Sequence, residues 1–158
     1  MEKISNRALI SRLYNSAEQQ LAEAQCDYKN WKPWYQIVQG MTGPEKMVYV
    51  MVKLNQTVTS GGFANFYTHA LGIFAPEIIY VLNEIQATAS AEIVSQSLSI
   101  VNPTGLLDDV YKDYVFNMDL SEKQRTLLYT QDIQYDQLQG IENLEDLLGG
   151  YLQLKMGH

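Results

Sequence analysis

Few side chains in this sequence have the type and spacing that catalysis requires. His69 is the only histidine before the C-terminal residue, and an imidazole can act as a general base near neutral pH. No His-Glu-x-x-His motif, cysteine pair or Gly-x-Ser-x-Gly motif supplies it with a metal or a nucleophile. Cys26 is the single cysteine, and without a neighbouring base we expect it to be a small, partly buried apolar residue. The sequence therefore favours a non-enzymatic protein and predicts no metal site and no cofactor.

Carboxylates are the more promising group, because they are concentrated in the last third of the chain. The formal net charge is −7, and residues 101–158 hold ten acids and four bases, against eight and seven in residues 1–100. Three like-charged pairs stand four residues apart: Asp109/Asp113, Asp132/Asp136 and Glu142/Asp146. Each such pair costs a helix about 0.2–0.5 kcal/mol, which favours a use for the acidic field. Two interpretations stay open here, a solvated acidic face and a surface for a basic partner.

An acidic surface of this kind repels nucleic acid and attracts basic proteins. We therefore expect a basic or DNA-binding protein as the partner, with no direct nucleic-acid contact. The candidate partner-binding residues are Asp108, Asp109, Asp113, Asp132, Asp136, Glu142, Glu145 and Asp146. A divalent cation at the first three of these is disfavoured, because the loop pattern of an EF-hand is missing.

The stretch TSGGFANFYTHALG, residues 59–72, is the second notable feature. Phe63, Phe66 and Tyr67 share one face of a helix. Gly61 and Gly62 before them allow the preceding helix to end in a sharp turn, and the sequence predicts a helix, a tight corner and a short helix. No lysine follows the glycines, so a phosphate-binding loop is a poor alternative.

Three further residues complete the predicted corner. Gly72 stands where a residue with positive φ would stop the short helix. Asn65 and His69 are four residues apart and share a polar flank beside the apolar face. A ligand pocket near Asn65, Tyr67 and His69 is therefore an alternative to a purely structural corner.

The elements that must position these residues read as a series of helices. Ser5 or Asn6 is expected to cap the first one. Residues 30–40 are expected to be a bridge that packs Trp31, Trp34 and Tyr35 onto the core. The first expected helix covers residues 6–28, and a second begins at Pro44. A third runs from Pro76 through an inward-facing Ala89, and Ser90 is expected to cap a fourth. Three more are expected: a short helix marked by Leu107, Val110, Tyr111 and Tyr114, a helix that begins with the capping box of residues 121–124, and a last helix over roughly residues 142–155. Residues 133–138 carry no decisive pattern.

The bulk properties set the fold class. A chain of 158 residues with 46% hydrophobic residues suits one domain, and we expect an all-α, compact domain of about seven to nine helices. Its expected organisation is an N-terminal helix and Trp-rich bridge, residues 1–44, packed as one unit with residues 45–158. The N-terminal residues lack a continuous apolar core, and no stretch approaches the ~20 apolar residues of a spanning helix, so we expect a cytoplasmic protein without membrane contact.

Residues 45–155 resemble an uncharacterised all-α bacterial family that includes a neisserial DNA-mimic protein. The family's hallmark is an Asn-Gly-Gly-Phe segment followed by a glutamine, aromatics, an asparagine and a glycine. The matching positions are Ser60, Gly61, Gly62, Phe63, Asn65, Phe66, Tyr67, His69 and Gly72. Residues 75–98 and 135–155 resemble the family's later helices. This sequence departs from the hallmark at Ser60, Asn65, Thr68 and His69.

The resemblance implies an acidic homodimer that occupies the DNA-binding face of a transcription factor. Together with the charge pattern it favours a protein-interaction module of the DNA-mimic kind. The alternative left open is a small-ligand-binding domain, or an enzyme that uses the Gly-Gly-Phe corner.

Overall fold

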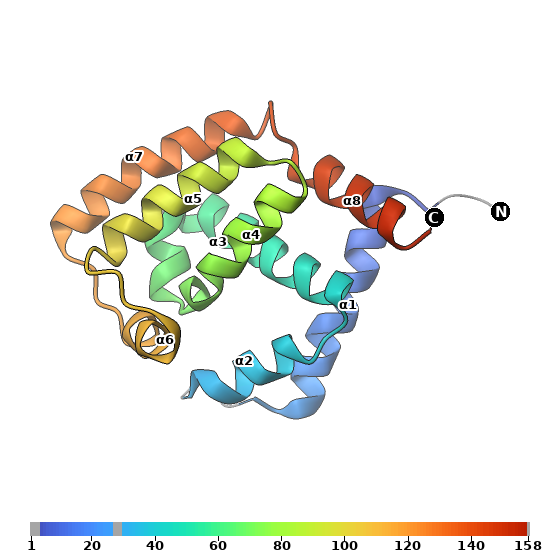
Figure 1. The fold of residues 1–158 in the computed structure, drawn as a ribbon, viewed down its shortest axis with the longest axis horizontal. Coiled ribbons are helices and arrows are strands. Elements are labelled where there is room, and N and C mark those ends of the chain that lie inside the picture. Colours follow the sequence, from blue (N-terminus) through green and yellow to red (C-terminus); the bar gives the residue numbers. More distant parts are fainter. Residues whose placement is uncertain (1–3, 27–29, 158) are drawn as a thin grey trace. The chain divides into compact units, whose positions relative to one another are not determined.

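The computed structural model describes residues 4–26 and 30–157, and within these ranges all regular secondary structure is helical (Figure 1). The elements are α1 (Asn6–Ala24), α2 (Trp31–Gln39), α3 (Gly43–Thr68), the 3₁₀-helix η1 (Leu71–Phe74), α4 (Ala75–Glu84), α5 (Thr88–Val101), α6 (Asp108–Phe116), α7 (Glu122–Leu138) and α8 (Leu144–Lys155). The eight α-helices of the described residues confirm the predicted all-α class and the predicted number of helices.

Packing divides the chain into two units. Unit 1 comprises residues 1–52 and 143–158, and unit 2 comprises residues 53–142. Helix α3 begins in unit 1 and ends in unit 2. The expected organisation with a boundary at residue 44 stays a prediction.

In unit 1, α1 packs against α2 and α8. The Ser5 hydroxyl accepts a hydrogen bond from Ala8 N at 3.1 Å, so Ser5 is the predicted N-cap. The predicted apolar stripe, with Leu9, Leu13 and Leu21, is buried. The helix ends earlier than predicted because Gln25 takes a left-handed conformation with φ 50°, and residues 27–28 of the expected helix lie outside the described residues.

The expected bridge after α1 is a helix, α2, and that part of the prediction is wrong. Asn30 caps it by accepting a hydrogen bond from Lys32 N. Pro33 lies in the first turn, where the backbone N–H that proline lacks would have no partner within the helix. Trp31 and Trp34 are buried as expected, whereas Tyr35 is only half-buried. The Trp34 indole donates to the Tyr49 hydroxyl at 3.0 Å. The Trp-rich segment therefore belongs to the core of unit 1.

A buried carboxylate holds the start of α3. Glu45 accepts hydrogen bonds from the Ser16 hydroxyl, from Gln20 Nε2 at 2.9 Å and from the Thr42 backbone at 3.0 Å. The Ser16 hydrogen bond is the main reason that the pKa of Glu45 lies below its usual value. The predicted helix from Pro44 is confirmed, with Pro44 in the first turn.

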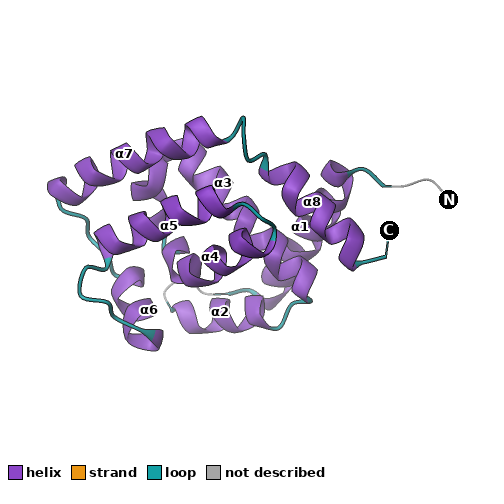
Figure 2. Ribbon diagram, turned by 45° about the horizontal axis from the view of Figure 1, so that its top comes forward, coloured by secondary structure: helices purple, strands orange, loops and turns teal. Residues whose placement is uncertain are grey.

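In unit 2, α5 lies between α4 and α7, as both ribbon views show (Figures 1 and 2). Helix α4 ends at Glu84, so Ala89 does not continue it and is exposed, contrary to the prediction. Ser90 lies inside α5 and does not cap it. The capping box of Ser121 and Gln124 is confirmed, and α7 runs through the undecided residues 133–138.

Helix α6 is held by two tyrosines. The Tyr111 hydroxyl donates to Gly72 O at 2.6 Å, and the Tyr114 hydroxyl donates to Val101 O at 2.8 Å. Of the four apolar residues that marked the predicted helix, only Tyr111 is buried, while Leu107 and Val110 are well exposed.

Candidate functional site

The Gly-Gly-Phe corner is a break in α3 at Gly62. This residue has φ 76° and ψ −176°, a conformation that is essentially restricted to glycine. The helix resumes at Phe63 and ends at Thr68. The predicted arrangement of helix, tight corner and short helix is therefore confirmed.

Asp132 on α7 caps the restarted helix. Its Oδ1 accepts a hydrogen bond from Phe63 N at 2.7 Å. A Cβ placed on Gly62 would lie 2.8 Å from Asp132 Cγ, so the missing side chain makes room for the carboxylate. Burial raises the pKa of Asp132, and the Phe63 hydrogen bond only partly offsets this effect.

The aromatic residues after the corner form the core of unit 2. Phe63, Phe66 and Tyr67 are fully buried, and successive rings pack edge to face. Tyr135 of α7 packs edge to face on Phe63 with ring centroids 5.6 Å apart. The Tyr67 hydroxyl shares a 2.8 Å hydrogen bond with Ser97, and burial raises the pKa of this phenol. The predicted apolar face therefore packs inward.

Gly72 does not stop the short helix, contrary to the prediction. That conformational role falls to Ala70, which has φ 63°, whereas Gly72 lies within η1. Gly72 is required for space, because a Cβ there would lie 2.8 Å from Tyr67 Cε1. The absent side chain lets the Tyr67 ring lie against the backbone.

The polar residues of the corner serve its own backbone. Asn65 Nδ2 donates to Thr57 O at 2.9 Å and to the Ser60 hydroxyl at 3.1 Å. His69 Nδ1 lies 2.9 Å from Asn65 O, and since a carbonyl only accepts, this nitrogen is the donor. His69 is exposed, whereas Tyr67 is buried. Asn65, Tyr67 and His69 therefore do not converge on one pocket.

A cleft of about 280 Å³ lies beside the corner. Its lining includes the backbone of residues 58–62 together with Asp132, Ile133 and Asp136 of α7. Asn65 and His69, the residues expected to face a ligand, are not among its lining residues.

Six of the eight predicted partner-binding carboxylates belong to unit 2. Asp108, Asp109 and Asp113 of α6 and Asp136 of α7 are exposed. Asp132 is half-buried against the corner. The four exposed ones remain the candidates for contact with a partner.

Glu142 has a structural task that the sequence does not reveal. Its Oε1 accepts from Ser90 N and the Ser90 hydroxyl, both at 2.7 Å, and its Oε2 accepts from Ala89 N at 3.1 Å. It therefore caps α5 from a position 52 residues away. Burial raises the pKa of Glu142, but these hydrogen bonds outweigh it and leave the pKa below its usual value.

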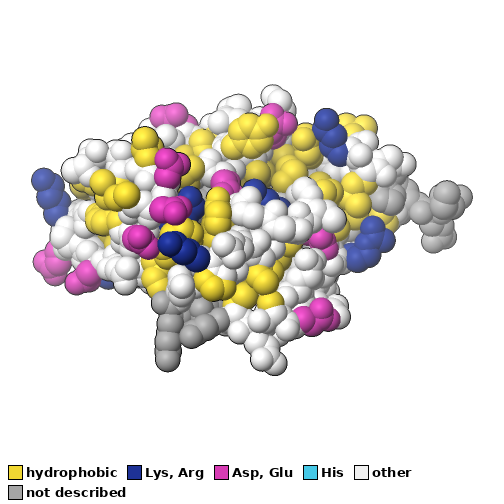
Figure 3. Space-filling model, turned by 60° about the horizontal axis from the view of Figure 1, so that its bottom comes forward, with side chains coloured by type: hydrophobic (Ala, Val, Ile, Leu, Met, Phe, Trp, Pro, Cys, Tyr) yellow, Lys and Arg dark blue, Asp and Glu magenta, His cyan; other side chains and the backbone are white. Residues whose placement is uncertain are grey.

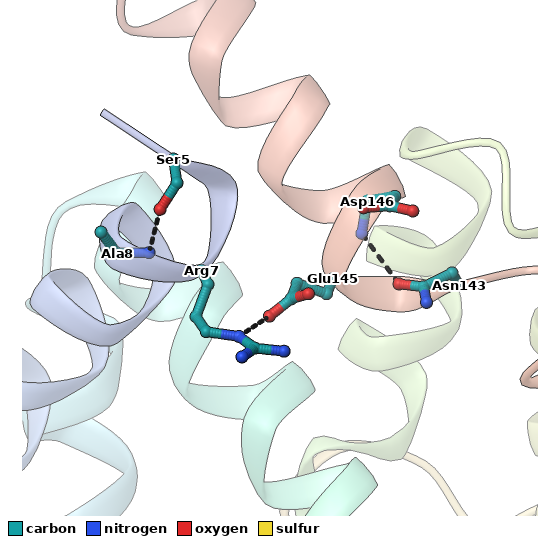
Figure 4. Close-up of polar contacts among 6 residues, drawn as sticks. All are labelled: Ser5, Arg7, Ala8, Asn143, Glu145 and Asp146. Atoms are coloured by element: carbon teal, nitrogen blue, oxygen red, sulfur yellow. Dashed lines mark hydrogen bonds and ion pairs between the residues drawn. The ribbon is translucent and has the colours of Figure 1, made fainter. Parts of the chain in front are cut away.

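The remaining two carboxylates, Glu145 and Asp146, lie in unit 1 in the first turn of α8. Glu145 forms an ion pair with Arg7 Nε at 2.9 Å (Figure 4). Asn143 caps the helix by accepting from Asp146 N at 3.0 Å, and the Asp146 side chain is exposed. The eight predicted residues thus divide between two units, and their binding role stays a prediction.

The comparisons with known proteins give one match. A family model described as DMP19-like protein matches residues 39–155, about three-quarters of the chain. The chain belongs to the DMP19-like protein family. DMP19 is the neisserial DNA-mimic protein, so the resemblance seen in the sequence is confirmed. The DMP19-like family is not known as an enzyme family. Neither the curated proteins nor the solved structures give a match.

The charge of this DMP19-like chain separates between its units. Unit 2 holds eleven acids and four bases and so carries the whole formal net charge of −7, while unit 1 holds seven of each. The sequence alone located the excess in residues 101–158, because the unit boundaries were not visible in it.

Two other functional classes find no support in the described part of the chain. No group of three or more histidine, cysteine or acidic residues there could hold a metal ion. No described helix is both long enough and apolar enough to cross a bilayer.

Proposed function

We propose that this protein is a non-enzymatic, acidic interaction module that occupies the DNA-binding surface of a basic protein. The observation that carries the proposal is the confinement of the net charge of −7 to the 90 residues of unit 2. A field of one sign raises the local concentration of an oppositely charged partner and accelerates encounter.

The exposed acids of α6 are spaced in a way that suits a surface that binds DNA phosphates. Asp109 and Asp113 are exposed and one helical turn apart, which is about 6 Å of rise. Phosphates of one DNA strand recur every ~3.4 Å along the axis and lie farther apart through space. A rigid helix that carries carboxylates at such intervals can meet the lysines and arginines that otherwise bind phosphates.

The residues that could act as a general base near the corner already form structural hydrogen bonds to the backbone. His69 donates to a backbone carbonyl, and Asp132 caps the Gly-Gly-Phe corner. These contacts support a structural role for the corner, and we assign the proposed activity to the acidic surface instead.

The test is competition with DNA. The chain is immobilised, its partners are captured from bacterial extract at low salt and identified, and each purified partner is titrated with labelled duplex DNA in the presence of the chain. We expect the chain to displace DNA, with an affinity that falls steeply between about 50 and 200 mM salt.

Matched variants assign the effect to unit 2. Neutralising Asp108, Asp109, Asp113 and Asp136 to asparagine is expected to abolish displacement. Neutralising Glu23, an exposed acid of unit 1 outside the predicted set, is expected to leave it unchanged. A partner that binds the chain and DNA at the same time, or one that is insensitive to the four substitutions, contradicts the proposal.

A further inference from the structure

Helix α6 exposes apolar side chains beside its acids. Leu107 is 74% exposed, Val110 63% and Tyr114 38%. Val110 and Tyr114 stand four residues apart on one side of α6, and Leu107 is the N-cap residue just before its first turn. Single exposed apolar residues are ordinary on protein surfaces, but three gathered on and just before one short helix are a mark of an interaction site.

These side chains are exposed because the opposite face of α6 is fixed in the core. Tyr111 and Val115 are buried, and the Tyr111 hydroxyl binds Gly72 O. Tyr114 is anchored through its hydroxyl to Val101 O, so its ring is held in place while one side stays exposed. The outer face of α6 is therefore a pre-organised surface, and a partner pays little to order it.

Acidic side chains lie along the same helix next to the apolar ones. At about 100° per residue, Asp109 and Asp113 lie roughly 60–100° around the helix axis from Val110. Both aspartates are exposed. Figure 3, in which the bottom of the Figure 1 view comes forward, shows acidic and hydrophobic side chains next to one another on the left of the face.

Charge selects the occupant of this surface. A second copy of the chain would bring another unit with a net charge of −7 to the same place, and like charges across an interface are unfavourable. A basic amphipathic helix supplies both an apolar face for the exposed apolar side chains and cations for the aspartates.

We propose that the outer face of α6 binds a basic amphipathic helix of the partner, with Leu107, Val110 and Tyr114 as apolar anchors and Asp109 and Asp113 as ion-pair acceptors. This inference rests on the proposed function and deepens it. It states that recognition has two separable parts. The ion pairs weaken as salt rises, whereas the apolar contact does not.

The probe is a synthetic amphipathic helix of about 18 residues with leucines on one face and lysines on the other. Its matched control replaces the leucines with serines and keeps the charge. Binding to the full-length chain is followed by the anisotropy of a dye on the peptide over a series of salt concentrations. Amide shifts in NMR spectra of the labelled chain locate the contact.

Three variants separate the two parts of recognition. Val110→Ser is expected to weaken binding of the leucine peptide by about tenfold at every salt concentration. Asp109→Asn together with Asp113→Asn is expected to flatten the dependence on salt. Ile141→Ser removes another apolar side chain of unit 2, 80% exposed, and is expected to change nothing. All of these side chains are exposed, so the variants are expected to fold.

The inference is overturned if the serine peptide binds as tightly as the leucine peptide, if Val110→Ser is without effect, or if the shifted amides lie away from α6. A dimer of the chain that Val110→Ser dissociates would also overturn it, in favour of a second copy as occupant. A natural partner that displaces no DNA, while the leucine peptide still binds α6, would refute the proposed function and leave this inference standing.

Discussion

Replacement of Gly62 by alanine tests the geometry of the corner most directly. The residue has φ 76° and ψ −176°, and an alanine forced into this conformation costs about 1–3 kcal/mol. The added Cβ would also lie 2.8 Å from Asp132 Cγ, so the carboxylate has to move. Its 2.7 Å hydrogen bond from Phe63 N is then lost, and an unsatisfied amide costs about 1–3 kcal/mol more. We expect Gly62→Ala to lower the free energy of unfolding by about 2–6 kcal/mol.

The assay is urea unfolding followed by far-ultraviolet circular dichroism, and two other glycines serve as controls. Gly105 has φ 69° with nothing within 4 Å of an added Cβ, so Gly105→Ala carries backbone strain alone, about 1–2 kcal/mol. Gly140 has neither a positive φ nor a near neighbour, and Gly140→Ala is expected to be close to neutral.

A double-mutant cycle isolates the clash. In the Gly62→Ala background, Asp132→Ala removes the atoms that the new Cβ meets, so it is expected to cost less there than in the wild type. The reasoning is refuted if Gly62→Ala costs no more than Gly105→Ala, or if the two substitutions at the corner are additive.

Three other contacts give shorter predictions. Ser121→Ala breaks the capping box of α7 and is expected to cost about 1 kcal/mol in thermal melts, and an unchanged melting temperature would show that the box contributes nothing. Glu142→Gln weakens the cap of α5 and is expected to cost about 1–3 kcal/mol at neutral pH. The pKa of Glu142 is lower in the folded chain, so its carboxylate stabilises the fold above the ordinary value of 4.5, and this stabilisation is lost as the pH falls below that value. A difference in urea midpoint between the wild type and Glu142→Gln that persists in acid would contradict the assignment. Tyr111→Phe removes one of two donors to the Gly72 carbonyl, the other being Ala75 N, and is expected to cost about 0.5–1.5 kcal/mol in urea unfolding, whereas a neutral effect would mean that the hydroxyl hydrogen bond contributes nothing.

The sequence predicts best what depends on neighbouring residues. The caps at Ser5 and Ser121 need only the next few residues, and both are observed. The corner at Gly62 also follows from local chemistry, because two adjacent glycines between helical patterns favour a positive φ. The all-α class follows from helical periodicity along the whole chain.

Contacts between distant residues decided the points that the sequence could not predict. Ser90 looks like a cap for α5, but the Glu142 carboxylate supplies the cap from 52 residues away. Gly72 looks like a helix stop, but the Tyr67 ring is what requires a glycine there. A pattern shows that a position favours glycine without showing whether conformation or space is the cause.

The candidate site shows the same limit. Periodicity places Val110 and Tyr114 on one side of α6, but it does not tell which side the rest of the unit covers. The charge count likewise identified an acidic region, and only the packing of the chain showed that unit 2 holds all of the net charge.

The burial of Trp31 and Trp34 in α2 has an optical consequence. They are the only tryptophans of the chain, and both belong to unit 1. Excitation at the red edge of the indole absorption band therefore excites only unit 1, whose formal net charge is zero. Unit 2, which has no tryptophan, does not fluoresce at that wavelength. The two units can thus be followed by separate fluorescence signals: unit 1 by its tryptophan emission, and unit 2 by a fluorophore attached to it.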